Sequence, residues 1–103
     1  MRVSDFVFKC LADYGVKHVF LVVGGGSMFL NDSLRCEKRI KTVFQHHEQA
    51  CAIAAEGYSR VTGSLSVVNV TTGPGSTNTI TGVLGQWTDS VPVLYISGQV
   101  KFE

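Results

Sequence analysis

The chain has 103 residues, of which 45% are hydrophobic and 17% charged, and its formal net charge is +1 at pH 7. It is therefore too apolar for a disordered tail, too short for more than one small domain, and too evenly charged to hold nucleic acid by bulk electrostatics. The apolar run over residues 19–23 is far shorter than a bilayer span and the three cysteines show no CxxC spacing, so we expect a cytoplasmic chain with no membrane partner and no disulfide framework.

The first third of the chain predicts a helix, a strand and a glycine-rich turn. Ser4 is placed to cap the helix and Gly15 to end it. The apolar residues at helical spacing on its expected buried face are Val7, Cys10, Leu11 and Tyr14. An apolar run over residues 18–23 then predicts a buried strand that ends in three consecutive glycines.

The middle of the chain predicts a second strand between two helices. Ser27 is placed to cap a brief first helix, and the strand covers residues 41–45. The following helix ends at Gly63. The residues on its expected buried face are Ala50, Ile53, Ala54, Gly57, Tyr58 and Val61.

The last third predicts two more strands around a helix. A strand over residues 65–71 is broken by a Gly-Pro-Gly turn, after which Ser76 or Thr77 caps the helix. The stripe on this helix that we assign to the core is Ile80, Val83, Leu84 and Trp87. Pro92 opens the fourth strand, over residues 93–97, at a strand position where proline is tolerated.

Strands that alternate with helices indicate an α/β fold with three layers, in which helices cover both faces of a mostly parallel sheet of the flavodoxin-like or Rossmann-like kind. The last two strands are apolar enough to be buried on both sides. The chain runs from the fourth strand to Glu103 without another helix, which would leave an open sheet edge. We therefore expect residues 1–103 to be the front part of a longer α/β domain.

A ligand is expected where parallel strands end at their carboxyl edge. Four unusual turns leave the strands at this edge, at residues 24–26, 46–49, 71–76 and 97–99. None of them is a GxGxxG fingerprint or a GxxxxGK[ST] loop, so neither a dinucleotide nor a P-loop nucleotide is indicated.

Glu48 has two interpretations at the residue level. It begins an alanine-rich helix, where the helix dipole alone favours an acid. Alternatively, the small residues around it let another backbone pack closely over the carboxyl group. Burial would then raise its pKa, which suits proton exchange with a ligand base.

Three other features of this edge contain residue types that can bind a metal or another ligand. His46, His47 and Cys51 lack the second histidine of a zincin helix and any further ligand cluster, so we expect no metal site. Residues 71–76 could cradle an anion with backbone amides or form an ordinary turn. Asn78 is either a structural hydrogen-bonding residue or a ligand contact.

The sequence resembles the N-terminal pyrimidine-binding domain of thiamine-diphosphate enzymes, most of all the acetolactate synthase branch. The segments that carry the resemblance are HEQA at 47–50, AEGYSRVTG at 55–63, TGPGSTN at 72–78, DSVPV at 89–93 and SGQ at 97–99. They cover nearly the whole chain in the family's order and spacing.

The resemblance implies a role for each matching residue. The matching glutamate, Glu48, hydrogen-bonds N1′ of the aminopyrimidine ring and promotes the imino tautomer, which removes the proton from thiazolium C2. The residues that would line the pyrimidine pocket with it are Pro74, Gly75 and Asn78. Those near the substrate would be Gly24, Gly25 and Gly26 in the first loop, with Gln99 near the floor of the active site. The implied activity is decarboxylation or carboligation of a small 2-keto acid.

The resemblance also implies parts that these 103 residues do not contain. The family's diphosphate-binding domain, with its GDG motif and Mg²⁺ ligands, is not in the sequence, so this chain alone is not expected to be catalytic. The family forms its site between subunits, which implies a homodimer or tetramer. Some acetolactate synthases also bind FAD, and no residue here points to it. Val23 stands where the family usually has a proline before its glycine pair. Because this loop faces the substrate in the family, the identity of the substrate is left undetermined.

Two alternatives stay open at this level. One is a non-catalytic interaction or regulatory module that retains the scaffold. The other is an α/β domain that binds a different phosphate ligand at residues 72–76. Calorimetry with thiamine diphosphate and Mg²⁺ would separate them from the enzyme hypothesis.

Overall fold

Four parallel strands form the centre of the computed structural model, which describes residues 1–100. The strands are β1 (His18–Leu21), β2 (Lys41–Phe44), β3 (Ser66–Val70) and β4 (Val93–Ser97). Their order in the sheet is β2-β1-β3-β4, and every neighbouring pair is parallel. This confirms the predicted α/β class and the parallel sheet.

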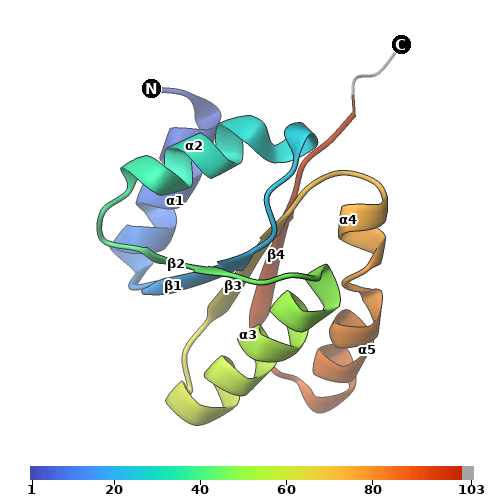
Figure 1. Cartoon of the computed structure of the whole chain (residues 1–103). Helices are drawn as coiled ribbons and strands as arrows, with labels where there is room; N and C mark the ends of the chain where they lie inside the picture. Colours follow the sequence, from blue (N-terminus) through green and yellow to red (C-terminus); the bar gives the residue numbers. More distant parts are fainter. Residues whose placement is uncertain (101–103) are drawn as a thin grey trace.

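Helices cover both faces of the sheet (Figure 1). On one face lie α1 (Val3–Tyr14) and α2 (Met28–Cys36), which follows the 3-10 turn η1 (Gly25–Ser27). On the other lie α3 (Glu48–Thr62), the single turn α4 (Pro74–Thr77) and α5 (Ile80–Asp89). No helix within residues 1–100 has both the length and the apolar character needed to cross a membrane.

Alternating strand residues divide the core into two clusters. Val19 and Leu21 of β1 pack with Phe8 of α1 and Leu34 of α2. Phe20, between them, packs on the α3 side with Cys51, Ala55 and Val68. All five residues of β3 are buried, as expected for a strand covered on both faces. β4 is an edge strand of the described sheet and is partly exposed, so the same expectation is wrong for β4.

The predicted helix faces are wrong in part. On α1 the fully buried residue is Phe8, while Tyr14 is 76% exposed. On α3 the buried residues are Cys51, Ala52, Ala55 and Ser59, whereas Ala50, Ile53 and Val61 of the predicted face are exposed. On α3 the error has a physical cause, because periodicity ranks residues by hydropathy whereas close helix packing selects small ones.

The largest of these corrections is on α5. Trp87, assigned to the core, is 83% exposed, and Gly82 and Gln86 are buried in its place. Gly82 packs directly against Ala52 of α3. Gln86 donates from Nε2 to the carbonyl of Ala52 at 2.8 Å and accepts from the hydroxyl of Tyr95 at 2.5 Å. A polar side chain with both groups paired is therefore buried more favourably here than a bulky apolar one.

Several element boundaries also differ. α1 begins at Val3 after Arg2, and the hydroxyl of the predicted cap Ser4 is instead hydrogen-bonded to that of Ser33 at 2.8 Å. The predicted cap at Ser76 or Thr77 lies inside the separate turn α4. α5 then begins after Thr79. β1 ends at Leu21, two residues before the predicted end, where the chain turns toward the glycines.

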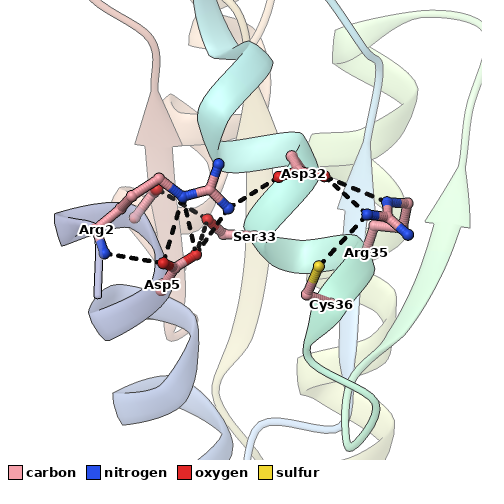
Figure 2. Close-up of polar contacts among 7 residues, drawn as sticks. Arg2, Asp5, Asp32, Ser33, Arg35 and Cys36 are labelled. Carbon is pink, nitrogen blue, oxygen red and sulfur yellow. Dashed lines mark hydrogen bonds and ion pairs between the residues drawn. The ribbon is translucent and has the colours of Figure 1, made fainter.

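A charged network ties α1 to α2 (Figure 2). Arg2 donates from Nη2 to Asp5 at 2.9 Å and to Asp32 of α2 at 2.8 Å. The hydroxyl of Ser33 donates to Asp5 Oδ1 at 2.6 Å. The Arg2 guanidinium, followed by the Ser33 hydroxyl, holds the pKa of Asp5 well below its usual range. Ionised groups thus join the start of α1 to the middle of α2.

Candidate functional site

The structure brings the turns at the carboxyl ends of β1, β3 and β4 into direct contact. A Cβ added to Gly24 would lie 2.5 Å from Cβ of Thr71, and one added to Gly26 would lie 2.5 Å from Cγ2 of Thr72. A Cβ on Gly98 would overlap the carbonyl oxygen of Gly26. Only hydrogen fits at these three positions, so the glycines allow three loops to approach one another.

Thr71 lies at the centre of this contact. Its side chain faces Gly24 and Gly26 of the first loop, and its Cγ2 would lie 2.6 Å from a Cβ on Gly75. Thr71 thus spaces the first loop from the turn that follows β3. Sequence reasoning placed Thr71 only at the start of an anion-binding turn and missed this role. The one available signal was its position directly after a buried strand.

Glu48 is the first residue of α3 and projects toward the turn after β3. The imidazole of His47 caps the helix, because its Nδ1 accepts from the Gln49 amide at 3.0 Å. Glu48 Oε2 accepts a hydrogen bond from Asn78 Nδ2 at 3.0 Å. Two residues that are 30 positions apart in the sequence are therefore paired at the sheet edge.

The expected rise in the pKa of Glu48 is wrong for this chain. The hydrogen bond from Asn78 lowers this pKa, and partial burial opposes that effect without overcoming it. An amide N–H that donates to a carboxylate stabilises the ionised form. Glu48 is therefore a hydrogen-bonded carboxylate here, in a side chain that is half-buried.

Pro74 and Gly75 shape the space beside this carboxylate. Gly73 has a φ of 59°, in the left-handed region, and turns the chain into Pro74 at the start of α4. Gly75 is buried, and a Cβ added there would lie 3.6 Å from Glu48 Oε1. Within residues 1–100, Oε1 accepts no side-chain hydrogen bond. A side chain at position 75 would therefore lie in van der Waals contact with the carboxylate.

The other predicted site residues have fewer contacts. Gln99 is exposed and follows Gly98, whose amide donates to the carbonyl of Val70 at 3.0 Å. Gly25 is exposed, with open space around its Cα. His46 is exposed too. Among residues 1–100, no three His, Cys, Asp or Glu side chains gather as metal ligands would.

In a parallel α/β sheet, ligands bind beyond the carboxyl ends of the strands, and this is the edge where the Glu48 carboxylate and the Gly-Pro-Gly turn lie. The family model described as "Thiamine pyrophosphate enzyme, N-terminal TPP binding domain" matches residues 1–103. The chain belongs to this family, which confirms the resemblance found in the sequence.

Its relatives include large subunits of acetolactate synthase. The chain is 43% identical over 97 residues to the acetolactate synthase large subunit of Buchnera aphidicola strain APS and 44% identical to that of Haemophilus influenzae. It is 43% identical to the acetolactate synthase isozyme 3 large subunit of Escherichia coli K12. Each match covers 94% of this chain and 17% of the relative. The chain thus spans less than a fifth of the length of these relatives.

Proposed function

We propose that this chain binds and activates the aminopyrimidine ring of thiamine diphosphate within an enzyme that decarboxylates or condenses 2-keto acids. The observation that carries the proposal is the Glu48 carboxylate, which is held at 3.0 Å by Asn78 beside the bare backbone of Gly75. Membership of the thiamine pyrophosphate family and similarity to acetolactate synthases support it.

When bound, thiamine diphosphate supplies the carbon nucleophile that attacks the keto group. The protein's part is orientation and proton control. Glu48 would hold a proton at its carboxylate and exchange it with the ring nitrogen, while Pro74 and Gly75 position the ring. Asn78 favours the ionised form of Glu48, so its hydrogen bond must weaken when the carboxyl group takes up a proton.

The first loop is proposed to face the substrate. Gly24 and Gly26, with Gly25 between them, lie against the turn after β3, on the edge to which Gln99 also belongs. Their position on the sheet edge where Glu48 also lies supports this role. A small 2-keto acid is the proposed substrate, because the relatives are acetolactate synthases.

The rest of the proposed enzyme lies outside this chain. A diphosphate-binding domain would hold Mg²⁺ and the diphosphate, and the pyrimidine-binding domains would join in a homodimer or tetramer. The exposed Ile80, Leu84 and Trp87 on α5 support such an assembly, since they form an apolar face. The three free cysteines fit a reducing compartment, and we propose the cytosol. No residue of this chain supports FAD.

Replacing Glu48 by Gln tests the proton role directly. In the protein encoded by the complete gene, E48Q should lower the rate of carbon dioxide release from a panel of 2-keto acids by at least about 100-fold, the range lost when a general acid-base group is removed. Calorimetry should show that thiamine diphosphate still binds, since the side chain keeps its size.

Glu56→Gln is the matched control. Glu56 lies on the same helix and pairs with Arg60 at 2.7 Å, so its loss should leave turnover within about twofold of the original protein. Full activity of E48Q would contradict the proposal. No turnover by the unaltered protein with any keto acid in the panel would favour the non-catalytic module.

A further inference from the structure

A chain of three hydrogen bonds connects the centre of the sheet to the first glycine loop. Asn69 of β3 donates from Nδ2 to Asn31 Oδ1 at 2.8 Å, and Asn31 of α2 donates from Nδ2 to Ser27 Oγ at 3.1 Å. The Ser27 hydroxyl then donates to the Gly24 carbonyl at 3.1 Å. Asn69 and Ser27 are buried. These residues are separate from the charged network between α1 and α2.

The direction of this chain is fixed by its last member. The Gly24 carbonyl can only accept, so Ser27 must spend its one hydroxyl proton on it. Ser27 Oγ must then accept from Asn31, which turns the Asn31 oxygen toward Asn69 and requires Asn69 to donate. Only this orientation of both amides satisfies all three bonds.

The arrangement leaves one atom without a partner. Asn69 Oδ1 is buried and, within residues 1–100, has no hydrogen-bond partner. Asn69 lies on the same face of β3 as Val67, whose neighbours are apolar. A buried unpaired carbonyl destabilises a fold, and an apolar residue of similar size would avoid that cost. Stability alone therefore does not account for Asn69.

The glycine loop needs an anchor from outside itself. Three successive glycines have no side chains of their own and lose more conformational entropy on ordering than other residues. Thr71 and Thr72 contact the loop from the turn after β3. On the other side the Gly24 carbonyl is held twice by Ser27, through its hydroxyl at 3.1 Å and its amide at 3.2 Å.

We propose that Asn69 and Asn31 are positioning residues that act through Ser27 to fix the Gly24 carbonyl, and so set the shape in which the first loop meets the keto acid. This inference rests on the proposed function, because it assigns the loop to the substrate. Breaking one of these three hydrogen bonds should raise KM for the keto acid. Binding of thiamine diphosphate should be unchanged, since Glu48 and Asn78 are not part of this hydrogen-bond chain.

Asn69→Leu separates positioning from structure. It removes the unpaired oxygen and the first hydrogen bond together. In the protein encoded by the complete gene, its thermal midpoint should be unchanged or raised, while KM for the keto acid that turns over fastest rises about tenfold, the effect of losing one buried hydrogen bond that orients a loop. A merely structural asparagine would lower stability and leave KM alone.

Ser27→Ala breaks the last bond, and Ser33→Ala is its matched control. Both serines are buried, Ser27 just before α2 and Ser33 within it, but Ser33 bonds to Ser4 and Asp5, away from the loop. S27A should raise KM about as much as N69L and speed hydrogen exchange at the amide of residue 27, which donates to the Gly24 carbonyl, whereas S33A should do neither.

The outcomes distinguish this inference from the proposed function. If E48Q abolishes turnover but S27A and N69L keep KM within about twofold of the original protein, the positioning role is wrong and the proposed function stands. If no keto acid is turned over, hydrogen exchange decides: unchanged exchange at the amide of residue 27 in S27A would overturn the inference. Faster exchange would support the anchoring of the loop.

Discussion

The two helical layers of this domain differ in the size and polarity of the side chains through which they pack. Large apolar side chains such as Phe8 and Leu34 lie between the sheet and α1–α2, and charged groups join the start of α1 to α2. On the other face α3 and α5 lie side by side: they meet through Gly82 and Ala52, and Gln86 of α5 accepts a hydrogen bond from Tyr95 of β4. The bulky Leu84 and Trp87 of α5 face outward.

We infer that the first layer contributes mainly to stability, whereas the second mainly fixes the position of α5. Exposed ion pairs contribute little, so the first layer is held mainly by the burial of its large side chains. The second layer gains less from burial, but its close helix contact fixes α5 relative to α3. That contact helps to place Asn78, at the turn before α5, against Glu48 at the start of α3.

The largest effect is expected in the first layer. Leu34→Ala should lower the free energy of unfolding by about 3 kcal/mol, because it leaves a cavity in a packed core. Leu84→Ala is the matched control on α5 and should change it by less than about 0.5 kcal/mol, since Leu84 is 64% exposed. Urea denaturation measures both, and equal losses would show that the two layers do not differ in this way.

A smaller loss of unfolding free energy is expected at the contact between Gly82 of α5 and Ala52 of α3. Gly82→Ala should cost roughly 2 kcal/mol, because the new methyl group overlaps the Ala52 side chain and must push α5 from α3. Gly57→Ala, on the outer side of α3 with open space around it, should instead stabilise by about 0.5 kcal/mol. The contact would not be close if G82A were as stable as G57A.

The smallest effect concerns the acidic groups near α2. The Arg39 guanidinium, which donates to Glu37 at 2.7 Å, lowers the pKa of Glu37 from 4.5 to about 2. Because the folded state favours the ionised form, this contribution to stability is complete above pH 4.5 and is lost as the pH falls toward 2. Thermal melts across this interval should show the loss. Arg39→Gln should reduce its slope, and an unchanged slope would exclude the pair as its source.

The sequence predicted what depends on local chemistry. Pro92 and Gly98 bracket β4, and its predicted residues 93–97 match the structure at both ends. Gly63 ends α3 with a φ of 67°, as the glycine at that position indicated. Convergence of the turns at one sheet edge also followed, since parallel strands leave their carboxyl ends on the same side.

What the sequence did not predict depends on contacts between elements. Trp87 is the largest side chain on α5, yet small and paired polar residues occupy the interior. The pKa of Glu48 depends on Asn78, a partner that only the fold supplies. Asn69 was recognisable as one polar residue in a β-branched run, but its route through Asn31 to the loop was not.

The single direction of the strands has a practical consequence for handling the protein. Every turn that enters a strand lies at the sheet edge opposite the rim, which is the edge formed by the glycine loops and Glu48. The fifteen residues of α3 separate Gly63 from Glu48 by roughly 22 Å. Gly63 and Ser64 are exposed. A fluorescent label or an immobilisation tether attached between them would report on the molecule from its far side, without obstructing the rim.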